Sequence, residues 1–123
     1  IYSKTHSDFF SLLQCVLTGA KFFDSDLSKA NLQGSVMEGA YFEGVTFNHA
    51  NLSELDLSTT FITNTDMKGT VLIETKLTGL SLLNIDFTGS NMTNTDLCGT
   101  VLDECDFTEV DMTTVKKTSL ART

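Results

Sequence analysis

Few side chains in this 123-residue chain have the types and spacing that acid–base, nucleophilic or metal chemistry requires. The two histidines, His6 and His49, have no cysteine or second histidine at a spacing typical of metal sites. The three cysteines are Cys15, Cys98 and Cys105, and an odd number leaves at least one thiol unpaired. We therefore predict no metal site and no cofactor, and we do not expect an enzyme.

Two acidic clusters, Asp24-Ser25-Asp26 and Asp103-Glu104-Cys105-Asp106, could hold a cation only weakly if they lie in strands, where neighbouring side chains point in opposite directions. Two tripeptides, Asn51-Leu52-Ser53 and Asn91-Met92-Thr93, match the acceptor pattern for N-glycosylation. A five-residue period in the sequence generates these tripeptides automatically. Neither kind of motif is therefore interpreted as a site.

That period is visible as an apolar residue, here called position i, at every fifth residue from Leu12 to Met112. A helix would repeat about every 3.6 residues and a strand every two, so each unit must contain its own change of direction. Positions i−2 are mostly small or apolar, whereas i−1 and i+1 are mostly polar. This predicts a short strand with i−2 and i pointing inward. All eight glycines stand at i+2, which predicts a tight corner there.

Outward i−1 residues are identical most often at a spacing of 20, in the pairs Val16/Val36, Asn31/Asn51, Asp66/Asp86 and Asp86/Asp106. A coil of four sides is therefore favoured. The units Ala30-Asn31-Leu32, Ala50-Asn51-Leu52, Leu55-Asp56-Leu57, Ser90-Asn91-Met92 and Thr95-Asp96-Leu97 resemble the A(D/N)LXX unit of the pentapeptide repeat family. This resemblance implies an all-β fold, a right-handed quadrilateral β-helix of about five coils. We expect an N-terminal capping segment (1–9), the repeat (10–115) and a C-terminal tail (116–123).

The composition limits the partners. The net charge of −8 disfavours direct binding of nucleic acid. The sequence contains no run of 18 apolar residues, so no membrane span is predicted. Thiols without a disulfide framework favour a cytoplasmic location, although a secreted or lumenal mature form stays open. The chain begins at Ile1, which suggests a trimmed or excised piece. Its last coil could be closed by homodimerisation.

Two sides of the coil carry distinctive outward residues. One side has exposed apolar residues, which typically mark a contact surface: Phe23, Tyr41, Phe61, Leu83 and Val101. The leading hypothesis is thus a non-catalytic scaffold that binds a protein partner through this flat side.

The next side carries an acidic stripe, Asp26, Asp66, Asp86 and Asp106. It serves either solubility or the imitation of a phosphate backbone. The family resemblance implies the second, alternative function, because some members mimic DNA, interact with DNA gyrase and confer quinolone resistance.

Overall fold

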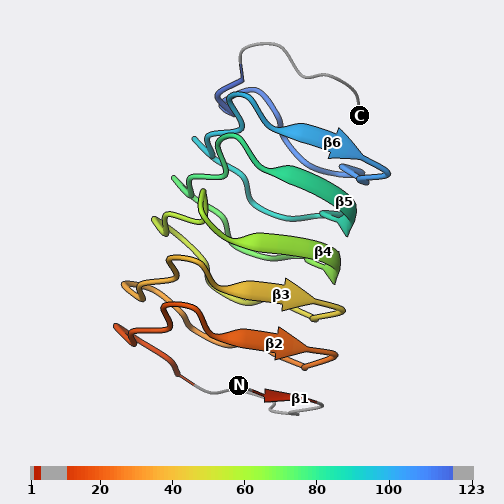
Figure 1. The fold of residues 1–123 in the computed structure, drawn as a ribbon. Coiled ribbons are helices and arrows are strands. Elements are labelled where there is room, and N and C mark those ends of the chain that lie inside the picture. Colours follow the sequence, from red (N-terminus) through yellow and green to blue (C-terminus); the bar gives the residue numbers. More distant parts are fainter. Residues whose placement is uncertain (1, 4–10, 118–123) are drawn as a thin grey trace.

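The computed structural model describes residues 2–3 and 11–117, which wind into a solenoid with one parallel sheet along one side (Figure 1). The strands follow chain order: β1 (Tyr2–Ser3), β2 (Lys21–Phe23), β3 (Tyr41–Glu43), β4 (Phe61–Asp66), β5 (Ser81–Asp86) and β6 (Val101–Asp103). The described residues contain no helix. The predicted all-β solenoid is confirmed.

Neighbouring strands pair residues that are twenty positions apart, as in Lys21↔Tyr41 and Leu82↔Leu102. The four-sided coil of twenty residues is therefore confirmed. About four complete turns lie between β2 and β6, slightly fewer than the predicted five, because that count included the incomplete coils at both ends.

The predicted terminal segments are described only in part. Of the proposed cap (1–9), only β1 lies within the described residues, where it pairs with β2. Of the proposed tail (116–123), only Lys116 and Lys117 are described. Lys116 still continues the ladder, because its N–H donates to the Thr95 carbonyl at 2.8 Å and its own carbonyl accepts from Leu97 N–H at 2.7 Å.

The corners consist of two residues, i+1 and i+2, rather than i+2 alone. On three sides an N–H usually closes the turn on the carbonyl three residues earlier, as from Ala50 to Phe47 at 2.9 Å. Every described residue with positive φ stands at i+2, and these include Glu54 and Glu74 as well as the glycines. On the fourth side, β4 and β5 run through the corner with Asn64 and Asn84 at positive φ.

The interior is filled by positions i and i−2, as the alternation predicts. All i residues from Phe22 to Leu102 are buried, and so are all i−2 residues from Ser25 to Thr100. Phe42 stacks on Phe22 with ring centroids 5.2 Å apart. At both ends the core is only half-buried, at Leu12, Leu17, Phe107 and Met112.

Buried threonines at i−2 tie consecutive coils together with their side chains. The hydroxyl of Thr95 donates to the Leu72 carbonyl at 2.6 Å, and Thr70, Thr75 and Thr100 make the equivalent bond at 2.8–2.9 Å. Ser90 occupies the same position, but its buried Oγ has no hydrogen-bond partner among the described residues.

This contrast predicts opposite effects of removing the two hydroxyls. Thr95→Val should lower the free energy of unfolding by about 1 kcal/mol, because a buried hydrogen bond is lost. Ser90→Ala should leave it unchanged or raise it by up to about 1 kcal/mol, because an unsatisfied polar group is removed. Urea unfolding of the two variants checks this, and equal destabilisation by both would contradict the assignment.

Candidate interaction surfaces

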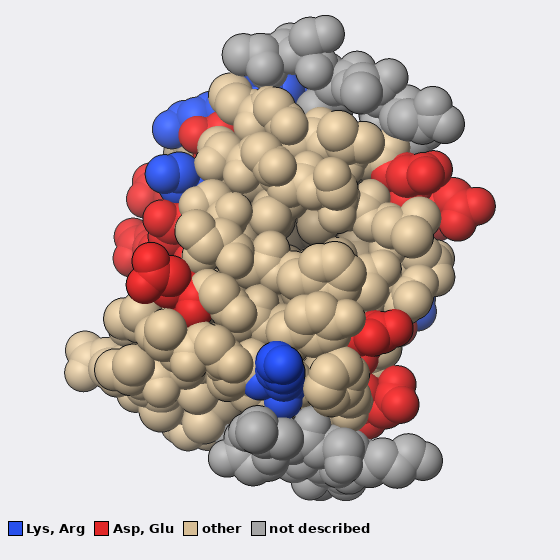
Figure 2. Space-filling model, viewed as in Figure 1, with Lys and Arg blue, Asp and Glu red and all other residues tan. Residues whose placement is uncertain are grey.

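The five apolar residues singled out in the sequence lie together on the face formed by β2–β6. We call the outward side chains of the first three residues in each of these strands the strand face. Phe23, Phe61, Leu83 and Val101 are 39%, 48%, 44% and 40% exposed, and Tyr41 is half-buried. Figure 2 shows this face as largely uncharged, with most charged groups along its two edges. The position of the predicted surface is thus as expected, while its binding role remains a prediction.

The aromatic residues of the strand face support one another. The Tyr41 and Phe61 rings are stacked, with centroids 4.5 Å apart and planes 11° from parallel. Phe23 packs against Tyr41 at 5.3 Å with a 50° tilt. The Tyr41 hydroxyl donates to Glu43 Oε1 at 3.3 Å, and the pKa of Tyr41 is raised by desolvation and by this neighbouring carboxylate. These contacts hold a rigid aromatic surface outward.

The acidic stripe has a structural role that the sequence analysis missed. In each of its aspartates, Oδ1 accepts the backbone N–H two residues later, at 2.9–3.2 Å, which caps the following turn. Asn51 and Asn91 make the same cap. The tripeptides that match the N-glycosylation pattern are therefore turn motifs of the repeat. The signal in the sequence was the recurrence of Asp or Asn at i−1, two residues before the turn residue i+1 whose N–H it caps.

One lysine offsets part of the charge of the stripe. Lys68 Nζ lies 3.0 Å from Asp66 Oδ2 and 3.6 Å from Asp86 Oδ2, and Asp66 raises the pKa of Lys68. Burial opposes ionisation of Asp86, but its bonds to Thr88 and the charge of Lys68 outweigh this and lower its pKa. The negative charge of the stripe is therefore partly neutralised.

Capping by ionised aspartates predicts a loss of stability in acid. The Ser58 hydroxyl and N–H donate to Asp56 and lower the pKa of its carboxyl. A lowered folded pKa stabilises the fold above the unfolded pKa of about 3.9, and this contribution is lost as the pH falls through the folded pKa. The melting temperature should thus fall below about pH 4.

Asp56→Asn is the matched variant, because an asparagine oxygen can make the same cap without titrating, as Asn51 does. The drop in melting temperature between pH 7 and pH 3 should be smaller in this variant. An unchanged acid loss would show that the cap at residue 56 does not contribute to it.

No set of three metal-ligating side chains converges in the described part of the chain. His6 lies outside it, and His49 occupies an exposed corner with φ of 61°. Cys15, Cys98 and Cys105 are all free thiols. The two acidic clusters likewise form no such group within residues 11–117.

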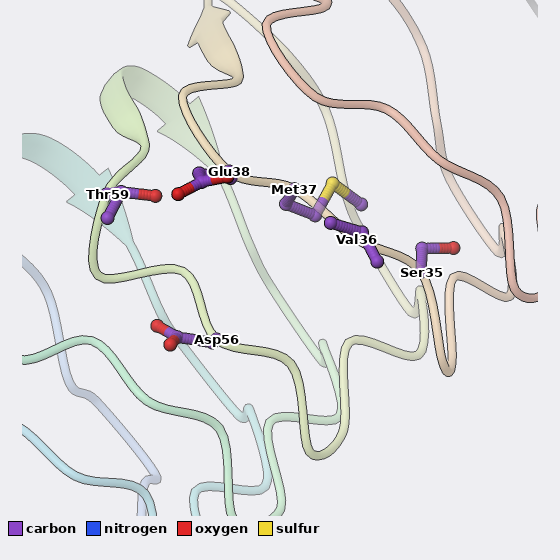
Figure 3. Close-up of a pocket in the computed structure, with 6 residues that line it drawn as sticks. All are labelled: Ser35, Val36, Met37, Glu38, Asp56 and Thr59. Carbon is purple, nitrogen blue, oxygen red and sulfur yellow. The ribbon is translucent and has the colours of Figure 1, made fainter.

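A shallow depression of about 260 Å³ lies on another side of the coil, lined by Ser35, Val36, Met37, Glu38, Asp56 and Thr59 (Figure 3). It borders a corner without positive φ, where the Thr59 hydroxyl instead accepts the Gly39 N–H at 3.2 Å. Exposed Val16 and Val36 lie on this side, at 75% and 48% exposure. The sequence shows that the two residues are identical, but not that they form an exposed apolar pair.

The described residues include no helix of the length and apolar character that crossing a membrane requires.

Three solved structures with similar folds are pentapeptide repeat proteins or a resistance protein. Rfr23 from the cyanobacterium Cyanothece 51142 is 19% identical, with 89% of this chain and 88% of that chain covered and a TM-score of 0.36. A pentapeptide repeat protein from the Arabidopsis thaliana thylakoid lumen is 21% identical, with 86% of this chain covered and a TM-score of 0.39; this chain spans 63% of its length. Full-length QnrB1, a plasmid-mediated fluoroquinolone resistance protein, is 21% identical, with 88% and 68% covered and a TM-score of 0.31.

No curated protein matches the sequence significantly. The family model for pentapeptide repeats matches residues 10–39, 25–64, 62–94 and 81–116, and thus nearly the whole chain. Together with the unbroken five-residue period and the twenty-residue coil, this match shows that the chain belongs to the pentapeptide repeat family.

Proposed function

We propose that this protein is a non-catalytic scaffold that binds a protein partner through the strand face. The observation that carries the proposal is the set of five apolar side chains gathered on one flat, largely uncharged surface. Contiguous exposed apolar residues commonly mark contact sites, and aromatic residues are enriched among those that dominate binding energy. The stacked Tyr41–Phe61 pair is the centre of this surface.

Two further features support a binding role rather than catalysis. Many polar side chains of the described residues are engaged in turn caps and bonds between coils, as at Asp86 and Thr95. The solenoid backbone is also tied at every coil, so the strand face is preorganised, which lowers the entropic cost of binding. A rigid, flat surface suits a partner with a complementary apolar patch.

The test is a quantitative pull-down with the purified chain and its variants Tyr41→Asp and Phe61→Asp. Proteins bound by the wild type should be recovered at least tenfold less by both variants, because a buried charge opposes apolar docking. Val71→Asp is the matched control, since Val71 also occupies an outward i−1 position, on another side of the coil. All three side chains point outward and none belongs to the core, so all three variants should fold. Undiminished recovery of every partner by the two strand-face variants would contradict the proposal.

Imitation of DNA at the acidic stripe is the second candidate, favoured by the net charge of −8. The charge density of the stripe is low compared with that of DNA. Duplex DNA carries about one charge per 1.7 Å, whereas one carboxylate per coil gives at most about one charge per 4.8 Å. Thr46 and Lys68 reduce it further. A supercoiling assay with gyrase distinguishes the candidates: no effect at high protein excess removes this one.

A further inference from the structure

We infer that the partner of the strand face is a second copy of this chain, docked about a two-fold axis that lies between β3 and β4. This inference rests on the proposed function and names its partner. The axis runs parallel to the strands and in the plane of the contact. The two solenoids then point in opposite directions, with β2 opposite β5 and β3 opposite β4.

The inference follows from the order of outward residues along β2–β5. They form two columns, one from the i−1 positions and one from the i+1 positions, with successive members one coil apart. The i−1 column is polar, aromatic, aromatic, polar: Lys21, Tyr41, Phe61 and Ser81. The i+1 column is apolar, polar, polar, apolar: Phe23, Glu43, Thr63 and Leu83. In each column, the order of polar and apolar residues is the same from β2 to β5 as from β5 to β2. A two-fold contact about an axis between β3 and β4 requires this symmetry.

In this register every apolar residue of β2–β5 meets an apolar residue of the other copy. Tyr41 lies opposite Phe61 and Phe23 lies opposite Leu83, each contact occurring twice because of the symmetry. The polar residues meet polar residues, with Lys21 opposite Ser81 and Glu43 opposite Thr63. No two like charges of β2–β5 lie directly opposite each other; the two Glu43 side chains are diagonal neighbours, about 4.8 Å apart along the solenoid, because each lies opposite Thr63 of the other copy.

The neighbouring registers are worse. An axis through β3 places Glu43 opposite Glu43, and an axis through β4 places Leu83 opposite Glu43. An axis between β4 and β5 places Glu43 opposite Asp103. An axis along the solenoid places Tyr41 opposite Glu43. Each of the four arrangements is opposed by like charges or by a carboxylate placed against an apolar or aromatic group.

The contact is small, so the dimer should be weak. Four coils at about 4.8 Å and four residues at about 3.3 Å give a flat projection of roughly 250 Å² per copy. Stable interfaces bury about 800 Å² per partner. We therefore expect a dissociation constant on the order of 100 µM.

Sedimentation equilibrium of the full chain from about 10 µM to 1 mM tests the inference. The wild type and the control Val71→Asp should dimerise, whereas Phe61→Asp and Tyr41→Lys alone should associate at least tenfold more weakly. An equimolar mixture of these two single variants should recover dimers, because the register places the introduced lysine of one copy opposite the introduced aspartate of the other. Far-UV circular dichroism of each variant confirms folding.

Three outcomes would overturn the inference: a wild type that is monomeric at 1 mM, a dimer that Phe61→Asp does not weaken, or a mixture that shows no recovery. The pull-down separates this failure from that of the proposed function. If the chain is monomeric but Phe61→Asp reduces the recovery of another protein in the pull-down, the second copy is not the partner. The proposed function is then retained. If Phe61→Asp alters neither association nor recovery, both fail.

Discussion

Phe42→Ala is expected to lower the free energy of unfolding by about 3–5 kcal/mol. Phe42 is 2% exposed and lies at the centre of the aromatic core. Its ring stacks on Phe22 at 5.2 Å and meets Phe47 edge-on at 5.2 Å. Both contacts are lost in the variant, and the hydrogen-bonded coils above and below limit collapse into the cavity. The cost should therefore lie near the upper end for a buried phenylalanine.

Phe107→Ala is the matched control for this prediction. Phe107 also occupies position i and stacks on a phenylalanine, Phe87, at 5.0 Å, but it is only half-buried at the end of the solenoid. Water can fill the space that its ring leaves, so the loss should be no more than about half as large. Urea unfolding measures both. Equal losses would show that the solenoid is packed as tightly around Phe107 as it is around Phe42.

The fold was predictable because one rule applies in every unit. An apolar residue at Leu72 and a small one at Thr70 both point inward for the same reason as at Leu52 and Ala50, so the period alone determines which residues are buried. The two-residue corners were less predictable. Glutamates at positive φ, such as Glu54 and Glu74, show that ladder bonds outweigh a local preference for glycine.

The surface was predictable in position but not in role. The alternation places Phe61 outward, yet its stacking on Tyr41 depends on the register between coils. From the sequence, the aspartates are predicted only as an acidic stripe. In the structure, Asp86 is first a cap for the Thr88 N–H, and its charge is shared with Lys68. In the sequence, such a hydrogen bond is visible only as the recurrence of Asp or Asn at i−1. A count of charged residues does not reveal it.

The absence of proline from the chain leads to the second large effect. Val71→Pro should destabilise the protein by about 3 kcal/mol or more, because a ladder donor is lost and the ring clashes with the preceding coil. Val71 N–H donates to the Ala50 carbonyl at 2.9 Å, and that buried carbonyl would lose this donor. Circular dichroism and urea unfolding should show a partly unfolded or strongly weakened solenoid.

Ile73→Pro, only two residues further, should cost less than about 1 kcal/mol. Ile73 is the second residue of a turn that Thr75 N–H closes on the Leu72 carbonyl at 3.1 Å, and Glu74 follows it with φ of 57°. Such a turn accepts proline at its second position, and the Ile73 N–H makes no backbone bond to a neighbouring coil. Its carbonyl, which accepts from Glu54 N–H at 2.9 Å, is kept in the variant. If both prolines proved equally harmful, the coil-to-coil N–H ladder would not be the feature that excludes proline from this chain.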